Sequence, residues 1–166
     1  MQQAGTQRSI RIAAQGDAAA VTSIINLAFQ VEKFFVDGDR ISLAQVESLM
    51  GRGEFLLQDG EAGLAGCVYV EKRADRAYLG LLSVDPALQG SGSGSRLVTA
   101  AEDRARALGC TFMDLNIVNL REELPDFYRR RGYVETGLAP FPAESPTKLP
   151  CHFIKMSKPL APSPQL

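Results

Sequence analysis

The alternation of apolar and polar residues in the first half of the chain predicts one strand, two helices and a meander of three strands. Helical spacing begins after Asp17, which stands at an N-cap position, and again after Ser42, which forms a capping-box pattern with Gln45. The strand-like runs are residues 9–13, 54–58, 64–70 and 78–84. Asp59-Gly60 predicts the first hairpin turn of the meander, and the charged run at 71–76 predicts the second.

The second half of the chain contains its clearest helix pattern. One face of this helix is apolar, formed by Leu97, Val98, Ala101, Ala105 and Leu108. Charged residues, among them Glu102, are expected outside that face, and Gly109 is expected to end the helix. Strands are predicted at 112–118, 133–138 and 152–157, and a short helix at about 122–131 with Pro125 in its first turn.

The composition predicts one globular domain. The 166 residues are 45% hydrophobic and 22% charged, which is enough for a core without disulfides. The chain from Lys158 onwards is rich in proline and is expected to fray, so we expect a domain over residues 1–160 and a flexible tail at 161–166. No internal repeat is found.

Charge and cysteine content exclude several classes of function. Eighteen Lys and Arg face 19 Asp and Glu, so no basic face for nucleic acid is indicated. The three cysteines have no metal-site or disulfide spacing and are expected to be reduced thiols, and the single histidine, His152, is expected to be structural. Neither a signal peptide nor a membrane span is indicated, so we expect a cytoplasmic protein without a metal.

A glycine-rich stretch at residues 90–94 separates the strand at 78–84 from the clearest helix. Pro86 offers no N–H group to a sheet, so the chain leaves the sheet before the glycines. One interpretation is a flexible linker, although linkers join domains and only one domain is expected. The other is an anion site, because the first N–H groups of a helix lack carbonyl partners and lie at the positive end of its dipole.

Two common phosphate-binding motifs do not match this loop. A P-loop requires a lysine, and none occurs between Lys72 and Lys148. The dinucleotide pattern GxGxxG requires a final glycine where the sequence has Ser95 or Leu97. Nucleoside triphosphates and dinucleotides are therefore disfavoured as ligands.

The pattern Val84-x-Pro86 followed by Gln89-x-x-Gly92-x-Gly94 resembles the GNAT superfamily of acetyl-CoA-dependent N-acetyltransferases. A second motif, a strand at 115–118 followed by a short helix and Tyr128-x-x-x-Gly132-Tyr133, resembles the C-terminal signature of the same family. The resemblance implies that loop amides hold the coenzyme A pyrophosphate and that the preceding strand binds the pantetheine arm through its backbone. The implied residues are Leu82, Ser83 and Val84 for the arm, and Gln89, Gly90, Ser91, Gly92, Ser93, Gly94 and Ser95 for the pyrophosphate.

The resemblance further implies an α+β (mixed α/β) fold, with a mostly antiparallel sheet in which the parallel strands 78–84 and 112–118 splay apart around the coenzyme. It implies direct transfer of the acetyl group to a primary amine, with Tyr128 as the general acid that protonates the leaving thiolate. The alternative is that the Tyr128 ring packs beside Leu124 and Phe127 as a core residue. Where the family often has an asparagine, the chain has Arg121, which either meets a phosphate or is a solvated charge at the start of a helix.

The acceptor is a small-molecule or peptide amine that the sequence does not specify further, and a homodimer is left open. Glu32, Asp37 and Asp39 share a segment with Phe34 and Phe35 where this family usually builds its acceptor pocket; the alternative is a loop held down by the two phenylalanines. Glu71 is a second candidate base, although it is expected to open a surface turn. The competing functions are an acyl-CoA-binding sensor or regulatory domain without catalysis and a phosphate-binding protein of another fold.

Overall fold

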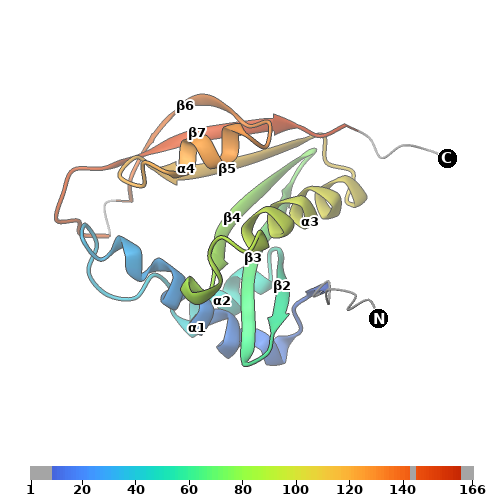
Figure 1. The fold of residues 1–166 in the computed structure, drawn as a ribbon. Helices are drawn as coiled ribbons and strands as arrows, with labels where there is room; N and C mark the ends of the chain where they lie inside the picture. Colours follow the sequence, from blue (N-terminus) through green and yellow to red (C-terminus); the bar gives the residue numbers. More distant parts are fainter. Residues whose placement is uncertain (1–8, 143–144, 162–166) are drawn as a thin grey trace.

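The structure is a computed structural model that describes residues 9–142 and 145–161 (Figure 1). Seven strands form one mixed sheet in the order β1-β2-β3-β4-β5-β7-β6. The strands are β1 (Ile10–Ile12), β2 (Glu54–Gly60), β3 (Gly63–Arg73), β4 (Arg76–Val84), β5 (Phe112–Val118), β6 (Val134–Pro140) and β7 (His152–Pro159). The helices are α1 (Ala18–Ala28), α2 (Leu43–Met50), α3 (Ser93–Ala107) and α4 (Leu124–Arg129), with short 3-10 helices η1 (Gln15–Asp17), η2 (Phe29–Glu32) and η3 (Pro86–Leu88). The predicted α+β class, its element order and the capping box of Ser42 and Gln45 are confirmed.

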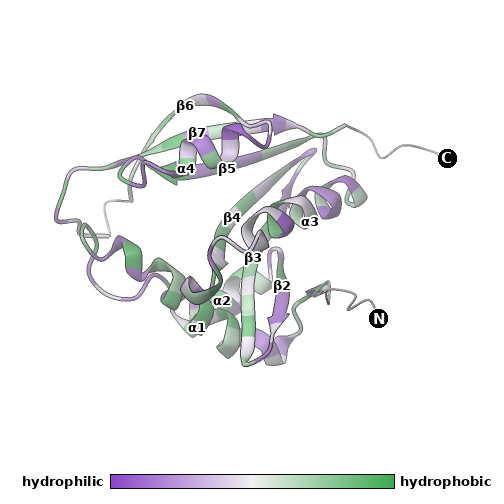
Figure 2. Ribbon diagram, viewed as in Figure 1, coloured by the Kyte–Doolittle hydropathy of each residue, from purple (hydrophilic) through white to green (hydrophobic). Residues whose placement is uncertain are grey.

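Helices cover both faces of the sheet, and β3 shows how the sequence assigns the faces. Successive side chains of a strand point to opposite sides. Val68 and Val70 lie in a core with α3, whereas Cys67 and Tyr69 lie in a second core with α1 and α2. All four are almost fully buried. Because both faces of β3 are covered, its sequence is a continuous apolar run without polar alternation. Figure 2 shows hydrophobic and hydrophilic residues mixed along α3, as expected for a helix with one face on a sheet.

The first hairpin turn lies further along the chain than its turn signal predicted, and the second lies within the predicted charged run but is shorter than that run. Asp59 and Gly60 belong to β2, where Asp59 pairs with Leu64 and Gly60 with Gly63, so the first turn is at 61–62. The strands β3 and β4 likewise continue to a tight turn at 74–75, because Arg73 pairs with Arg76. The paired residues gain ladder hydrogen bonds that outweigh the local turn preference of Asp-Gly.

Three further expectations about exposure are wrong. Glu102 is buried on α3, where its carboxylate accepts hydrogen bonds from the Tyr133 hydroxyl at 2.9 Å and from Lys158 Nζ at 3.0 Å. Glu71 lies within β3, not at a surface turn, and is buried against the Tyr69 hydroxyl at 2.6 Å. Leu160 is buried and its N–H group bonds to Thr111 O, so the chain stays packed beyond Lys158. Most of the tail expected to be flexible, residues 162–166, lies outside the described residues.

The strands β4 and β5 run parallel but pair only at their beginnings. The register joins Arg76 to Phe112, Ala77 to Met113 and Tyr78 to Asp114, and stops there. Beyond this point β4 continues beside β3, and β5 continues beside β7. Figure 1 shows the two halves of the sheet diverging from this junction. The expected splaying of the central parallel strands is therefore confirmed.

Candidate active site

A cavity of about 380 Å³ opens between the diverging parts of β4 and β5. Its walls come from β4, β5, η2, α4, the segment 36–40 and residues 141–142 and 145–146. It contains several residues singled out in the sequence, namely Glu32, Asp37, Asp39, Leu82, Arg121 and Tyr128. Elements from both ends of the chain thus converge on one site.

A β-bulge in β4 shapes one wall of this cavity. Cys67 pairs with Ser83 and Tyr69 with Gly80, so two residues of β4, Leu81 and Leu82, face one residue of β3. Leu81 has a φ of 53°, which is a left-handed conformation that a leucine rarely adopts. Such strain commonly marks functional sites. The sequence carried one signal of this bulge, since Gly80 interrupts an apolar strand.

Tyr128 is held at the cavity by the aromatic packing of α4. Its ring lies edge-on to Phe127 at 5.0 Å and to Tyr133 at 5.6 Å between centroids, and only 4% of the residue is exposed. Burial raises the pKa of its hydroxyl, so the phenol stays protonated at neutral pH. Among the described residues no hydrogen bond to this hydroxyl is found, and it is not one of the buried unpartnered side-chain atoms, so it remains available at the cavity that Tyr128 lines.

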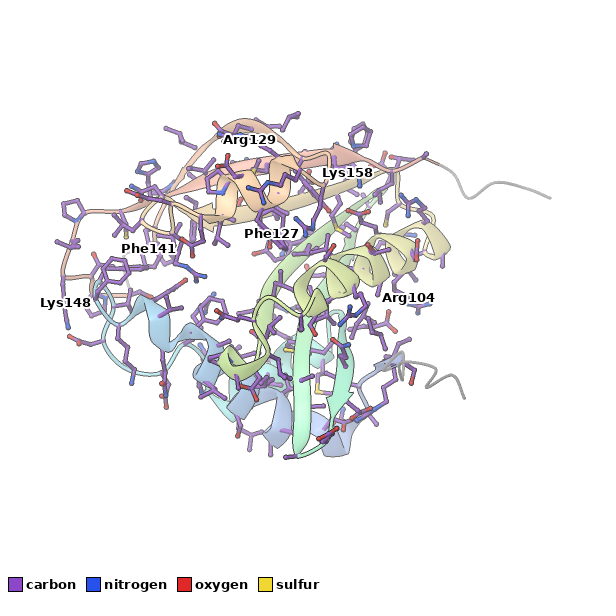
Figure 3. The ribbon with its side chains drawn as sticks, in the orientation of Figure 1. Arg104, Phe127, Arg129, Phe141, Lys148 and Lys158 are labelled. Atoms are coloured by element: carbon purple, nitrogen blue, oxygen red, sulfur yellow. The ribbon has the colours of Figure 1, made fainter. Side chains whose placement is uncertain are left out.

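The glycine loop enters α3 through two left-handed glycines. Gly90 has a φ of 86° and Gly92, the N-cap of α3, a φ of 87°. Gly92 has no side chain with which to cap the first N–H groups of α3, and no other side chain of the described residues caps them. A Cβ atom on Gly94 would lie 3.6 Å from the Phe127 ring, so the loop packs beside α4, and Figure 3 shows Phe127 between α4 and α3. Arg96, which the sequence analysis did not single out, reaches back to Ser91 O at 3.3 Å and adds a positive charge at the loop.

Arg121 is neither a solvated charge nor free for a phosphate. Its guanidinium lies 3.0 Å from the Glu32 carboxylate and 2.6 Å from the Glu123 carboxylate, and its side chain is 17% exposed. It therefore ties η2 to the segment before α4. Burial raises the pKa of Glu32, and the neighbouring Arg121 opposes that shift only in part. Asn119 has a different role, because its side-chain oxygen accepts the backbone N–H group of His152 at 2.8 Å.

The segment that carries Asp37 is fastened to the segment before β7. Val36 pairs with Thr147, Lys148 N donates to Phe35 O at 2.7 Å, and Lys148 Nζ lies 3.0 Å from the Asp37 carboxylate. Figure 3 shows Lys148 and Phe141 at this end of the molecule. Phe35 is fully buried whereas Phe34 is half exposed, so one phenylalanine anchors the segment. The segment that carries Asp37 is thus anchored to the rest of the protein and also forms part of the cavity wall.

Other candidate groups lie outside the cavity. His152 is in β7 and Glu71 faces Tyr69 on β3. Cys67, Cys110 and Cys151 are free thiols, and burial raises the pKa of Cys67 to about 12. The described residues contain no group of three or more His, Cys, Asp or Glu that could hold a metal ion. No helix within 9–142 or 145–161 is long and apolar enough to span a membrane.

The comparisons with known proteins agree with this geometry. The model of the acetyltransferase (GNAT) family matches residues 23–133, which is more than half of the chain. The chain therefore belongs to this family of acetyl-CoA-dependent N-acetyltransferases. A search of curated proteins found no match.

Solved structures of varied acetyltransferases share the fold. A putative phosphinothricin N-acetyltransferase is 22% identical, with a TM-score of 0.77 and coverage of 92% of this chain and 98% of that chain. The ribosomal-protein-S18-alanine N-acetyltransferase of Escherichia coli is 18% identical, with a TM-score of 0.73 and coverage of 95% and 96%. An aminoglycoside 6'-N-acetyltransferase complexed with coenzyme A is 20% identical, with a TM-score of 0.74 and coverage of 95% and 99%. At these identities the likeness concerns the fold.

Proposed function

We propose that the chain transfers the acetyl group of acetyl-CoA directly to a primary amine in the cavity between β4 and β5. The observation that carries this proposal is the end of β4–β5 pairing at Tyr78 and Asp114, which leaves an open wedge with Tyr128 in its wall. Direct transfer needs both substrates in one cavity, a donor for the departing thiolate and an acceptor for the amine proton. Each requirement has a candidate residue here.

The coenzyme arm would lie along the free edge of β4. From Leu79 to Val84 this strand pairs with β3 on one side and has no pairing with β5 on the other. An unpaired strand edge binds an extended chain of amides through backbone hydrogen bonds, and pantetheine is such a chain. Leu82, Ser83 and Val84 lead directly towards the glycine loop.

The pyrophosphate would be held by the loop from Gln89 to Ser95 at the start of α3. Its left-handed glycines and the uncapped N-terminus of α3 leave backbone N–H groups for an anion. Helix dipole and N–H groups act together, and Arg96 adds charge beside them. The side chains at 91, 93 and 95 are small, which keeps the backbone accessible.

Tyr128 is the proposed general acid, and Glu32 is the carboxylate best placed to accept the amine proton. The raised pKa of Tyr128 keeps its proton available for the thiolate, and its hydroxyl makes no competing bond among the described residues. Glu32 lines the same cavity, and burial moves its pKa upward towards neutral pH, which improves a carboxylate as a base. Metal ions have no part in this proposal.

The test is an acetyl-CoA turnover assay with the unmodified protein and a panel of primary amines, with released thiol as the readout. At least one amine is expected to give thiol release above the hydrolysis rate and an equal amount of N-acetyl product. Tight acetyl-CoA binding in calorimetry, together with no turnover for any amine, would instead support a sensor domain without catalysis.

A further inference from the structure

A second cavity, of about 280 Å³, lies between α2 and the strands β3 and β4. We refer to it as the arginine cavity, because its lining includes Arg40, Arg52 and Arg73. The remaining walls are Ile41, Gln45, Ser48, Leu49, Tyr69, Tyr78 and Leu81. None of the proposed steps of acetyl transfer uses this cavity.

The arginine cavity adjoins the cavity between β4 and β5 described above, which we call the central cavity. Arg40, Tyr78 and Leu81 line both. Leu81 is the strained residue of the β4 bulge, and the Tyr78 ring lies over Gly80, where an added Cβ atom would come within 2.8 Å of it. A molecule whose amine lies in the central cavity beside this bulge therefore has room to extend its other end among the arginines.

The positive charge of the arginine cavity is only partly balanced. Arg73 lies 2.6 Å from the Glu71 carboxylate and stacks over the Tyr78 ring at 4.3 Å. Arg40 stacks over Phe29 at 5.4 Å, and within the described part of the chain neither Arg40 nor Arg52 forms an ion pair. Two guanidinium groups are thus available to a ligand, and guanidinium groups bind carboxylates with paired hydrogen bonds.

The central cavity has a different charge pattern. Of its carboxylates, Glu32 is paired with Arg121 and Asp37 with Lys148, whereas Asp39 has no ion pair among the described residues. An ammonium group is attracted to this side, and an acidic group to the arginine cavity. The two adjoining cavities therefore suit a molecule that carries both charges.

Resting on the proposed acetyl transfer, we propose that the acceptor is a small amino acid-like amine whose carboxylate binds Arg40 and Arg52 in the arginine cavity. Tyr78 lines both cavities, and its hydroxyl is a further hydrogen-bond donor for that carboxylate. Burial raises the pKa of Tyr78, so it remains a donor at neutral pH. Polyamines and other purely cationic amines are disfavoured, because they would place positive charge against the arginines.

The test compares amino acids with the amines that result from removing their carboxylate, for example phenylalanine with phenethylamine and lysine with cadaverine. For the unmodified protein, kcat/KM from thiol release is expected to favour the acid of at least one pair by tenfold or more. Arg52→Gln, at an exposed position, should reduce this preference several-fold, because it should raise KM for the acid more than KM for the amine without a carboxylate. Lys155→Gln, which removes an exposed charge outside both cavities, is the matched control and should keep the preference.

A second readout separates this inference from the catalytic proposal. Calorimetry on protein saturated with coenzyme A measures binding of the acid and of its decarboxylated partner without turnover. If amines are acetylated but neither measurement favours the acid, or Arg52→Gln leaves the preference unchanged, the proposed function stands and the carboxylate site is wrong. If no thiol is released with any amine, calorimetry alone tests the carboxylate site. Equal affinity for the acid and for its decarboxylated amine, or no binding of either, then overturns the inference.

Discussion

The two ends of the β4–β5 pair differ in what holds them. At the closed end, from Arg76 to Tyr78 on β4, the strands share a parallel ladder, and Arg76 forms hydrogen bonds of 2.7 and 2.6 Å to the Asp114 carboxylate. At the open end no ladder joins the strands, and the space between them is a cavity. The same two strands therefore provide stability at one end and a binding wedge at the other.

Substitutions at the two ends should therefore have separable effects on folding and on activity. A side chain at the closed end contributes to folding through sheet pairing and an ion pair. A side chain at the open end faces the cavity and can be changed with less effect on folding. The following predictions test that separation.

The largest effect is expected at Tyr128, at the open end. Tyr128→Phe retains the ring and removes only the proton, so turnover should fall by about a hundredfold, as for loss of a general acid. Acetyl-CoA affinity and melting temperature should change little, because the hydroxyl has no partner among the described residues. Steady-state kinetics, calorimetry and thermal unfolding measure the three quantities.

Tyr133→Phe is the matched control for this variant. Its ring packs against Tyr128, but its hydroxyl donates to the buried Glu102 carboxylate. Removing that bond should cost about 1.5–3 kcal/mol of unfolding free energy and leave turnover largely intact. Parent-rate turnover by Tyr128→Phe would show that Tyr128 is a core residue.

The glycine loop should show the next largest effect. Gly92→Val places a branched side chain at a left-handed position beside the proposed pyrophosphate site, so acetyl-CoA affinity should fall about 30-fold, or ~2 kcal/mol. Gly109→Val is its control, because Gly109 has a φ of 84° just beyond the other end of α3 and its Cβ would meet nothing within 4 Å. Both variants should lose stability through backbone strain, but only Gly92→Val should lose affinity. Equal affinity of the two folded variants in calorimetry would rule out this pyrophosphate site.

A smaller effect is expected for the acceptor side of the cavity. Glu32→Gln should lower kcat/KM for the amine by about tenfold and leave acetyl-CoA affinity unchanged. Because the pKa of Glu32 is raised, the acidic limb of the parent pH profile should lie above the pKa of an exposed glutamate, and this limb should disappear in the variant. Glu123→Gln is the control, since Glu123 shares Arg121 but lies outside the cavity. An unchanged pH profile would exclude Glu32 as the base.

The smallest effect is expected at the closed end. Asp114→Asn removes the carboxylate that pairs with Arg76, and because the pair is partly exposed the loss should be about 1 kcal/mol or less. The Arg76 hydrogen bonds lower the pKa of Asp114, so its stabilisation is present above the unfolded pKa of about 3.9 and is lost as pH falls through the folded pKa. The melting temperature of the parent should therefore exceed that of the variant most at neutral pH, and this difference should disappear as the pH falls below ~4. If the difference in melting temperature persists in acid, the loss of stability comes from packing and not from the ion pair.

The sequence predicted the fold well because its signals are local and agree with one another. The helix after Ser42, the turn into α3 and the two parallel strands each carry a strong residue pattern. Exposure was predicted less well where polar residues find partners far along the chain. The Glu102 carboxylate is hydrogen-bonded to Tyr133 and Lys158, and Arg121 forms an ion pair with Glu32. Helical spacing alone contains no information about such pairs.

The candidate site was predictable in its motif-bearing part and, through the family resemblance, in the acidic segment of Glu32, Asp37 and Asp39. Tyr128 and the glycine loop could be found because neighbouring residues define them. The arginine cavity could not, because Arg40, Arg52 and Arg73 come from separate segments and only the packing of α2 on the sheet brings them together. The bulge of β4 had one local signal, Gly80, but leucine gives no local indication of the left-handed backbone at Leu81.

The placement of the tyrosines gives the protein a spectroscopic use. The chain has four tyrosines and no tryptophan. Tyr78 and Tyr128 line the central cavity, Tyr69 and Tyr78 line the arginine cavity, and Tyr133 packs on Tyr128. The tyrosine fluorescence of the protein therefore arises from the two cavities and the residue that packs against them, so ligand occupancy can be followed optically without attaching a label.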